Sequence, residues 1–117
     1  MKKIILISTF VALTGCSTIK EYWPRPHDPA MFNNLVATDL AVDNVNCEQP
    51  DWNKAKESAA QVSRYAEWRG DPQRENLKGL LAHTEHMSKG GSKMFCELGK
   101  KTAKQRIEAA KSAWEGR

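Results

Sequence analysis

Residues 52–72 read WNKAKESAAQVSRYAEWRGDP and hold the signal of one complete helix. Apolar side chains recur at steps of three and four residues, which places them in one helical stripe; they are Trp52, Ala55, Ala59, Val62 and Ala66. Gly70 then favours a helix stop. Asp71 followed by Pro72 is typical of a helix start, with an N-cap acceptor before a proline at the first helical position. The pattern predicts a helix over 52–69 and another from 72.

Similar helix start and stop signals divide the rest of the chain after residue 28. Asp28 precedes a proline as Asp71 does, Asp51 and Ser92 are two further N-cap candidates, and Gly90-Gly91 is a second stop. No stretch shows the sustained alternation of a strand. We therefore predict an all-α fold, a small bundle of about four helices with antiparallel neighbours, over residues 29–45, 52–69, 72–89 and 92–115.

Apolar stripes support the last two of these helices. The third helix has Leu77, Leu80, Leu81, Thr84 and Met87, and the fourth has Cys96, Gly99, Ala103, Ile107, Ala110 and Trp114, with Phe95 and Leu98 flanking it. Small residues in the second and fourth helices predict that these two backbones approach each other closely. The Gly90-Gly91-Ser92-Lys93 stretch lacks the spacing of a phosphate-binding loop and is interpreted as a turn between helices.

Asp39 lies on the apolar face of the first predicted helix, one turn after Leu35. An unpaired carboxylate inside such a stripe is costly to bury. Either the stripe drifts onto Leu40 and Val42 and leaves Asp39 in water, or Asp39 pairs with a lysine or arginine of another helix. A catalytic role is not indicated, because the sequence positions no second acid, base or nucleophile beside it.

The amino terminus has two lysines, an apolar run over residues 4–13, and then Leu13-Thr14-Gly15-Cys16. The run is too short to span a bilayer and ends in small residues, as a cleavable signal does. The last four residues resemble the lipobox of bacterial lipoproteins. That resemblance implies that residues 1–15 are removed as a signal peptide and that Cys16 becomes the lipidated amino terminus, with the lipid as membrane anchor.

Ser17 follows the lipobox cysteine, and in enteric-type bacteria the resemblance then implies the outer membrane, with the domain facing the periplasm. Sorting rules differ between bacterial groups. Residues 16–28 are expected to form an extended tether, because Pro24 and Pro26 exclude a continuous helix. Tyr22 and Trp23 lie on it and would contact the membrane interface, the domain or a partner. Residues 29–117 would be the α-helical periplasmic domain.

Two cysteines, Cys47 and Cys96, remain once Cys16 is assigned to lipid. In the oxidising periplasm an even pair favours a disulfide. It would join the first loop to the fourth helix and stabilise the fold by about 4 kcal/mol on the chain-entropy argument. A metal pair or a redox site is the alternative, and neither has the Cys-x-x-Cys spacing typical of it.

The charges are distributed unevenly along the chain. The formal net charge is +4, and it falls to +2 when Lys2 and Lys3 leave with the signal peptide, so nucleic acid is not an expected partner. Residues 16–51 have two basic and six acidic side chains, whereas residues 52–117 have 14 and eight. Either the two parts attract each other within the fold, or the basic part faces an anionic partner. The candidate cations are Lys100, Lys101, Lys104, Arg106 and Lys111.

The sequence gives little sign of catalytic or metal chemistry. His83 and His86 are weak metal candidates, since histidines three apart on a helix can share an ion, but both are expected to be solvated surface side chains. No nucleophilic triad, phosphate loop or paired acids are recognisable, so no metal, cofactor or enzymatic activity is predicted. Because the final residue is Arg117 rather than lysine, covalent attachment to the cell wall is not expected either.

These features favour a binding or adaptor module for another envelope component, either a protein or an anionic cell-wall polymer. One alternative is an envelope lipoprotein of a phage or mobile element that blocks a receptor or excludes a second infection. The other is a small ligand- or metal-binding module, centred on His83 and His86 or on a cavity between helices.

Overall fold

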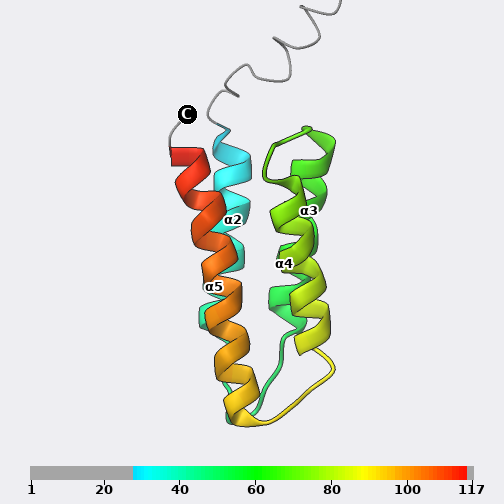
Figure 1. Ribbon diagram of the computed structural model, residues 1–117, viewed down its shortest axis with the longest axis vertical. Helices are drawn as coiled ribbons and strands as arrows, with labels where there is room; N and C mark the ends of the chain where they lie inside the picture. Colours follow the sequence, from blue (N-terminus) through cyan, green and yellow to red (C-terminus); the bar gives the residue numbers. More distant parts are fainter. Residues whose placement is uncertain (1–27, 116–117) are drawn as a thin grey trace, which may run out of the picture.

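A computed structural model describes residues 28–115 of the protein as a bundle of helices, without a strand in that range. The chain runs up and down between successive helices, so that neighbours are antiparallel (Figure 1). The predicted all-α fold is confirmed. The helices of the described range are α2 (Pro29–Asp43), α3 (Asn53–Trp68), α4 (Arg74–Met87) and α5 (Lys93–Glu115).

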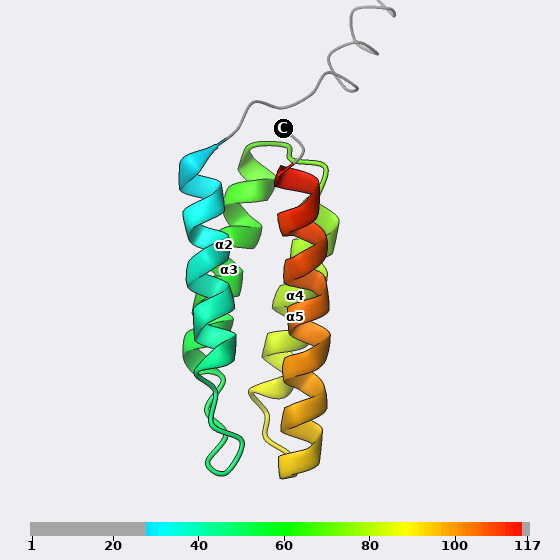
Figure 2. The ribbon, with the colours of Figure 1, turned by 90° about the vertical axis from the view of Figure 1, so that its left-hand side faces the viewer.

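Each helix packs on two of the others, so that the four form a closed ring of neighbours; in Figure 2, α2 and α3 lie on one side and α4 and α5 on the other. α2 and α4 each adjoin α3 and α5, whereas the backbones of α3 and α5 do not adjoin anywhere in the described range. The predicted close approach of these two helices is therefore wrong. The up-and-down connections place them on a diagonal, and Gly99 of α5 instead faces the Met87 side chain of α4.

The predicted side-chain caps are present at the first and last helix starts, although α5 begins at Lys93, one residue later than predicted. The Asp28 carboxylate accepts hydrogen bonds from the amides of Ala30 and Met31 at 3.1 and 3.2 Å, and α2 begins at Pro29. The Ser92 hydroxyl accepts the Phe95 amide at 3.1 Å at the start of α5. Before α3, the Asp51 carboxylate accepts the Asn53 amide at 3.0 Å, but α3 begins at Asn53, one residue later than predicted.

The predicted start of α4 is wrong by two residues. α4 begins at Arg74 rather than Pro72, because Asp71 caps a turn and is itself buried, with 1 % of its surface exposed. Its carboxylate accepts the Gln73 amide at 2.8 Å and the indole N–H of Trp114 at 3.1 Å. Burial against α5 therefore holds this corner of the chain, and the helix starts only after it.

The core is built from the predicted stripes. Every stripe residue named for α3 and α5 is buried, and in α4 only Leu81 is partly exposed. α2 contributes Met31, Leu35, Thr38 and Val42. The four inward faces thus meet in one hydrophobic core, as expected of a small helical bundle.

The disulfide between Cys47 and Cys96 is present, with the two sulfurs 2.10 Å apart and the Cα atoms 5.5 Å apart. It joins the loop after α2 to the first turn of α5, as predicted. This loop and the α4–α5 loop lie at one end of the bundle, whereas the start of α2 and the end of α5 lie at the other (Figure 1). We call the end with the disulfide the tip.

Candidate partner-binding surfaces

Several predicted features lie outside the described residues: the signal peptide, the lipidation site Cys16, and the tether residues Tyr22 and Trp23. Among the residues that the structure describes, no helix is both long enough and apolar enough to cross a membrane.

A charged seam runs between α2 and α5. The Lys104 ammonium group pairs with the carboxylates of Asp39 and Asp43, the latter at 2.8 Å. Of the interpretations of Asp39, pairing with another helix is therefore confirmed. Partial burial lowers the pKa of Lys104, but its hydrogen bonds to the two carboxylates outweigh this, and the pKa is raised above its ordinary value.

Three more of the five candidate cations are also engaged within the protein. Lys100 donates to the carbonyl oxygens of Asp43 and Val45 at 3.1 and 2.9 Å, which satisfies the carboxyl end of α2. Lys111 lies 3.9 and 3.8 Å from the carboxylates of Glu108 and Glu115, and Arg106 donates to Asn76 at 3.3 Å. Within residues 28–115, Lys101 alone of the five has no hydrogen bond or ion pair.

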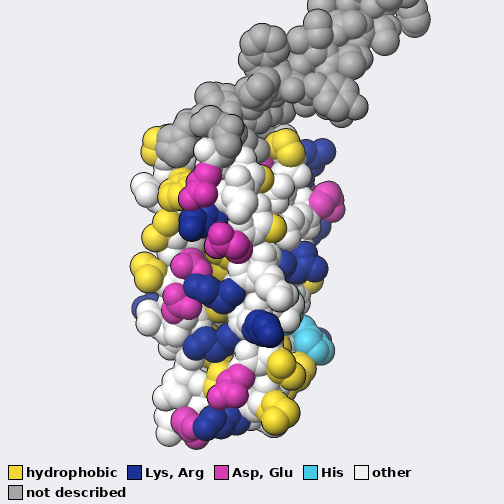
Figure 3. Space-filling view, turned by 60° about the vertical axis from the view of Figure 1, so that its left-hand side comes forward, with side chains coloured by type: hydrophobic (Ala, Val, Ile, Leu, Met, Phe, Trp, Pro, Cys, Tyr) yellow, Lys and Arg dark blue, Asp and Glu magenta, His cyan; other side chains and the backbone are white. Residues whose placement is uncertain are grey.

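Acidic and basic side chains alternate along this seam, as Figure 3 shows. Further ion pairs join the acidic first part of the chain to the basic second part. Asp28 lies 3.4 Å from the Arg69 guanidinium, and Glu48 pairs with Lys93 beside the disulfide. Most acidic side chains of the first part that the structure describes are thus paired with basic side chains of the second part.

Asp28 is the most connected of these carboxylates. It caps α2 and also accepts a hydrogen bond from the Tyr65 hydroxyl of α3 at 3.1 Å. Burial raises the pKa of Asp28, but the backbone amides, Tyr65 and Arg69 together bring it below its ordinary value. The hydrogen bond to Asp28 correspondingly raises the pKa of Tyr65.

The expectation that both histidines are solvated is wrong for His83. Its Nε2 atom lies 2.8 Å from the Gly99 carbonyl oxygen of α5, and its ring meets the edge of Trp52, so it is half-buried between helices. His86 is exposed and packs edge-on against Phe95. No three His, Cys, Asp or Glu side chains of the described range are grouped to hold a metal ion.

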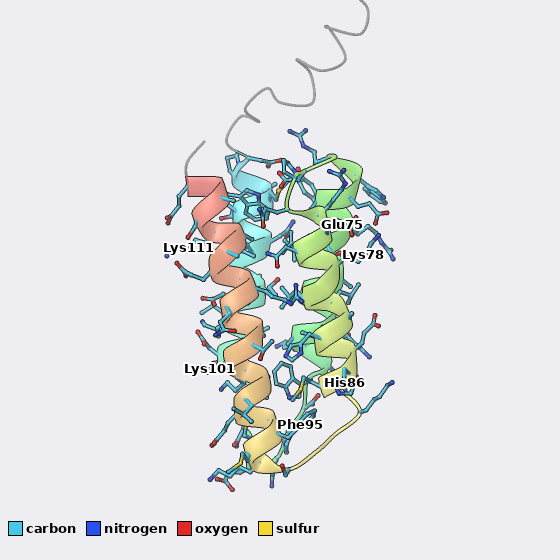
Figure 4. The ribbon with its side chains drawn as sticks, viewed as in Figure 1. Glu75, Lys78, His86, Phe95, Lys101 and Lys111 are labelled. Carbon is cyan, nitrogen blue, oxygen red and sulfur yellow. A yellow bond between two sulfur atoms is a disulfide. The ribbon has the colours of Figure 1, made fainter. Side chains whose placement is uncertain are left out.

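An exposed apolar cluster lies at the tip, formed by Met94, Phe95 and Leu98 of α5; we call it the tip cluster. Met94 is 71 % and Leu98 58 % exposed, and Phe95 lies near His86 at the lower end of the bundle in Figure 4. Apolar side chains also gather at this end in Figure 3. Large apolar residues gathered on the surface mark interaction sites more often than scattered ones do.

Sequence reasoning noted Phe95 and Leu98 only as neighbours of the α5 stripe and did not single out Met94. A signal was present, however. At 100° per residue, Met94 and Leu98 fall opposite the buried stripe of Cys96, Ala103 and Ile107, a position that helices of water-exposed bundles usually give to charged or polar side chains.

Comparison of the chain with protein-family models, with curated proteins and with solved structures finds no match. Function is therefore inferred from the surfaces of the molecule. Most of the candidate cations are held by groups of the same chain, two of them by carboxylates, and the tip cluster is apolar and exposed.

Proposed function

We propose that the protein is a lipid-anchored, non-enzymatic lipoprotein of the outer membrane that faces the periplasm and acts as an adaptor for another envelope component. The tip cluster carries this proposal. An adaptor needs a surface that contacts its partner, and Met94, Phe95 and Leu98 provide exposed apolar area in one place. We propose that the partner is a protein, because apolar anchors suit a protein interface better than an anionic polymer.

The pattern of charge supports a protein partner over cell-wall polymer. Lys104 and Lys111 form ion pairs with carboxylates of the same chain, and Lys100 donates its hydrogen bonds to backbone carbonyl oxygens, so fewer of these cations are free to bind a polyanion than the sequence suggests. Lys101 lies one turn beyond Leu98 on α5 and is unpaired in the described range. It would meet an acidic group at the rim of the interface.

The arrangement of the two ends fits a membrane anchor. α2 begins at the end opposite the tip (Figure 1), and α5, with 23 residues, spans about 35 Å between the ends. With a lipid on Cys16, the bundle would present the tip cluster away from the membrane. A partner in the periplasm would then meet apolar side chains, while the entry point of the chain faces the lipid.

Affinity capture from intact envelopes tests the adaptor role. Tagged wild-type protein is expected to retain one stoichiometric partner protein. The Met94→Ser/Leu98→Ser variant is expected to retain at most one tenth of the amount of that partner. Trp68→Ser is the matched control, since Trp68 is 80 % exposed at the other end of the bundle; it should capture as much as wild type. Equal capture by all three proteins, or recovery of cell-wall fragments alone, would reject the proposal.

The anchor is tested separately by mass spectrometry of the mature protein. We expect the amino-terminal peptide to start at Cys16 and to have the added mass of a diacylglycerol group and an acyl chain. The Cys16→Ser variant should lack this added mass. A wild-type protein that retains residues 1–15 or starts elsewhere without lipid would show that the lipobox interpretation is wrong.

A further inference from the structure

The outward face of α2 carries no charged side chain. Its positions follow one another at steps of three and four residues, and all are exposed; they are Ala30, Asn33, Ala37, Leu40 and Asn44. Val36 lies beside them, also exposed. The opposite face of the same helix contributes Met31, Leu35 and Val42 to the core. A helix that is uncharged and largely apolar on both faces is typically covered on both.

The charged side chains of α2 and the amide of Asn34 are turned away from this face. Asp39 and Asp43 pair with Lys104 of α5 on one side, and Asn34 accepts a hydrogen bond from Gln61 of α3 at 3.3 Å on the other. Figure 3 shows the result: mostly apolar and uncharged side chains along the left edge, next to the charged seam. The bundle thus uses its two sides for internal contacts and leaves the outward strip open.

The spacing of the strip matches the seam of a coiled coil, in which another helix lies alongside. Ala37 is small enough to let two backbones approach closely, and Leu40 provides an apolar contact. Asn33 and Asn44 stand at seam positions, where an asparagine can hydrogen-bond to its own copy across a parallel pair and fix the register. A pairing of the strip with itself brings no like charges together, and it satisfies both amides.

The size of the strip favours an occupant that is always close by. α2 has 15 residues, so the strip is about 22 Å long and about 10 Å wide, well below the area of about 800 Å² per partner that stable complexes in solution bury. A weak contact of this size becomes populated when both partners are held on one surface, because confinement raises their effective concentration into the millimolar range. A second copy on the same membrane meets this condition.

We propose that the outward strip of α2 pairs with the same strip of a second copy, in parallel, to form a dimer at the membrane. The parallel orientation rests on the proposed lipid anchor, since both chains then enter the bundle from the same bilayer. In this register Asn33 meets Asn33, Ala37 meets Ala37 and Asn44 meets Asn44 across a two-fold axis. The tip clusters of both copies remain exposed at the far end.

Cysteine cross-linking of the full-length protein in isolated membranes tests this pairing. Asn33→Cys and Asn44→Cys are each expected to give a disulfide-linked dimer on mild oxidation. Lys78→Cys is the control, because Lys78 is exposed on α4, diagonal to α2, and it should stay monomeric. In a mixture of the two variants, a disulfide that forms only between Asn33→Cys and Asn44→Cys would mean that the pairing is antiparallel and the proposal is wrong. The absence of any cross-linked dimer in membrane-bound protein would also overturn the proposal.

A second measurement separates failure of the dimer from failure of the anchor. The full-length Cys16→Ser protein is followed by sedimentation at rising concentration, where a weak dimer should appear at high micromolar to millimolar protein. Ala37→Glu places two carboxylates against each other at the axis and should weaken this dimer at least tenfold, without unfolding, because Ala37 is exposed. If the Cys16→Ser protein dimerises equally well with and without Ala37→Glu, the proposed interface is wrong. If instead the wild-type protein dimerises but proves to have no lipid, only the proposed anchor is contradicted.

Discussion

At the scale of single residues, two carboxylates hold the end of the bundle where α2 begins. Asp28 joins the start of α2 to α3 through Tyr65 and Arg69, and the buried Asp71 joins the α3–α4 corner to Trp114 of α5. Both residues precede a proline in the sequence, and both were predicted as helix caps. The two carboxylates differ in what they contact. Asp28 caps a helix directly, whereas Asp71 is buried and accepts a hydrogen bond from the indole N–H of Trp114.

The lowered pKa of Asp28 predicts an acid-sensitive contribution to stability. A carboxylate whose pKa is lower in the folded than in the unfolded protein stabilises the fold when it is ionised. Its contribution is complete at pH values above its pKa in the unfolded chain, about 3.9, and is lost as the pH falls through its pKa in the folded protein. Urea unfolding of wild type and Asp28→Asn should therefore differ most near neutral pH and converge toward pH 2. Tyr65→Phe should reduce the difference in part, since it removes one hydrogen bond. Parallel stability curves for wild type and Asp28→Asn from pH 6 to pH 2 would contradict this assignment.

Trp114→Phe should destabilise the protein by about 1 to 3 kcal/mol, because a buried carboxylate loses a hydrogen-bond donor. The measurement is denaturant unfolding followed by circular dichroism. Trp68→Phe is the control at an exposed position, where a change within about 0.5 kcal/mol is expected. Equal effects of the two substitutions would mean that the Asp71–Trp114 contact adds nothing to stability.

At the scale of helices and loops, the apolar periodicity predicted most of the architecture. The stripes of α3 and α5 lie in the core as expected, and helix ends differ from prediction by one or two residues because capping side chains also take part in tertiary contacts. The diagonal placement of α3 and α5 was missed, since periodicity gives the buried face of a helix but not the neighbour that covers it. His83 was missed for the same reason: it lies at the edge of its stripe, and the Gly99 carbonyl of the adjoining helix draws it inward.

The candidate surfaces were less accessible to sequence reasoning than the core. A run of cations predicts an exposed basic face, yet Lys100 and Lys104 contact groups of α2 that are more than fifty residues away in the chain. Only the three-dimensional arrangement reveals these contacts, in which carboxylates match the charge of Lys104 and backbone carbonyl oxygens hold Lys100. The tip cluster, in contrast, can be predicted from the sequence, because the exposure of Met94 and Leu98 follows from the helical wheel alone once the buried stripe is known.

The disulfide should contribute strongly to stability, because it closes a separation of 49 residues between the α2–α3 loop and α5. Reduction is expected to cost roughly 2 to 5 kcal/mol and to lower the melting temperature accordingly. The Cys47→Ala/Cys96→Ala variant should melt at the temperature of the reduced wild type and should not respond to reductant. Free thiols at both positions in protein from oxidising conditions would contradict the pairing.

At the scale of the whole molecule, the bundle has two chemically different ends and one uncharged strip between them. α2 begins at one end, the tip cluster and the disulfide lie at the other (Figures 1 and 4), and the uncharged strip of α2 runs between them. In the proposed account, a lipid holds the first end at the outer membrane, the strip pairs two copies, and the tip binds a periplasmic protein. The charged seam joins α2 to α5 through Lys104 and two carboxylates.

Site-specific photo-crosslinking in intact cells tests the central claim that the tip binds a partner. A photoreactive residue replaces Leu98 in one variant and Trp68 in a second, and adducts are identified by mass spectrometry. Both positions are large, apolar and exposed, but they lie at opposite ends of the bundle. The account predicts one dominant protein adduct from position 98 and none of that protein from position 68. Adducts that are absent from position 98, or identical at the two positions, would contradict it.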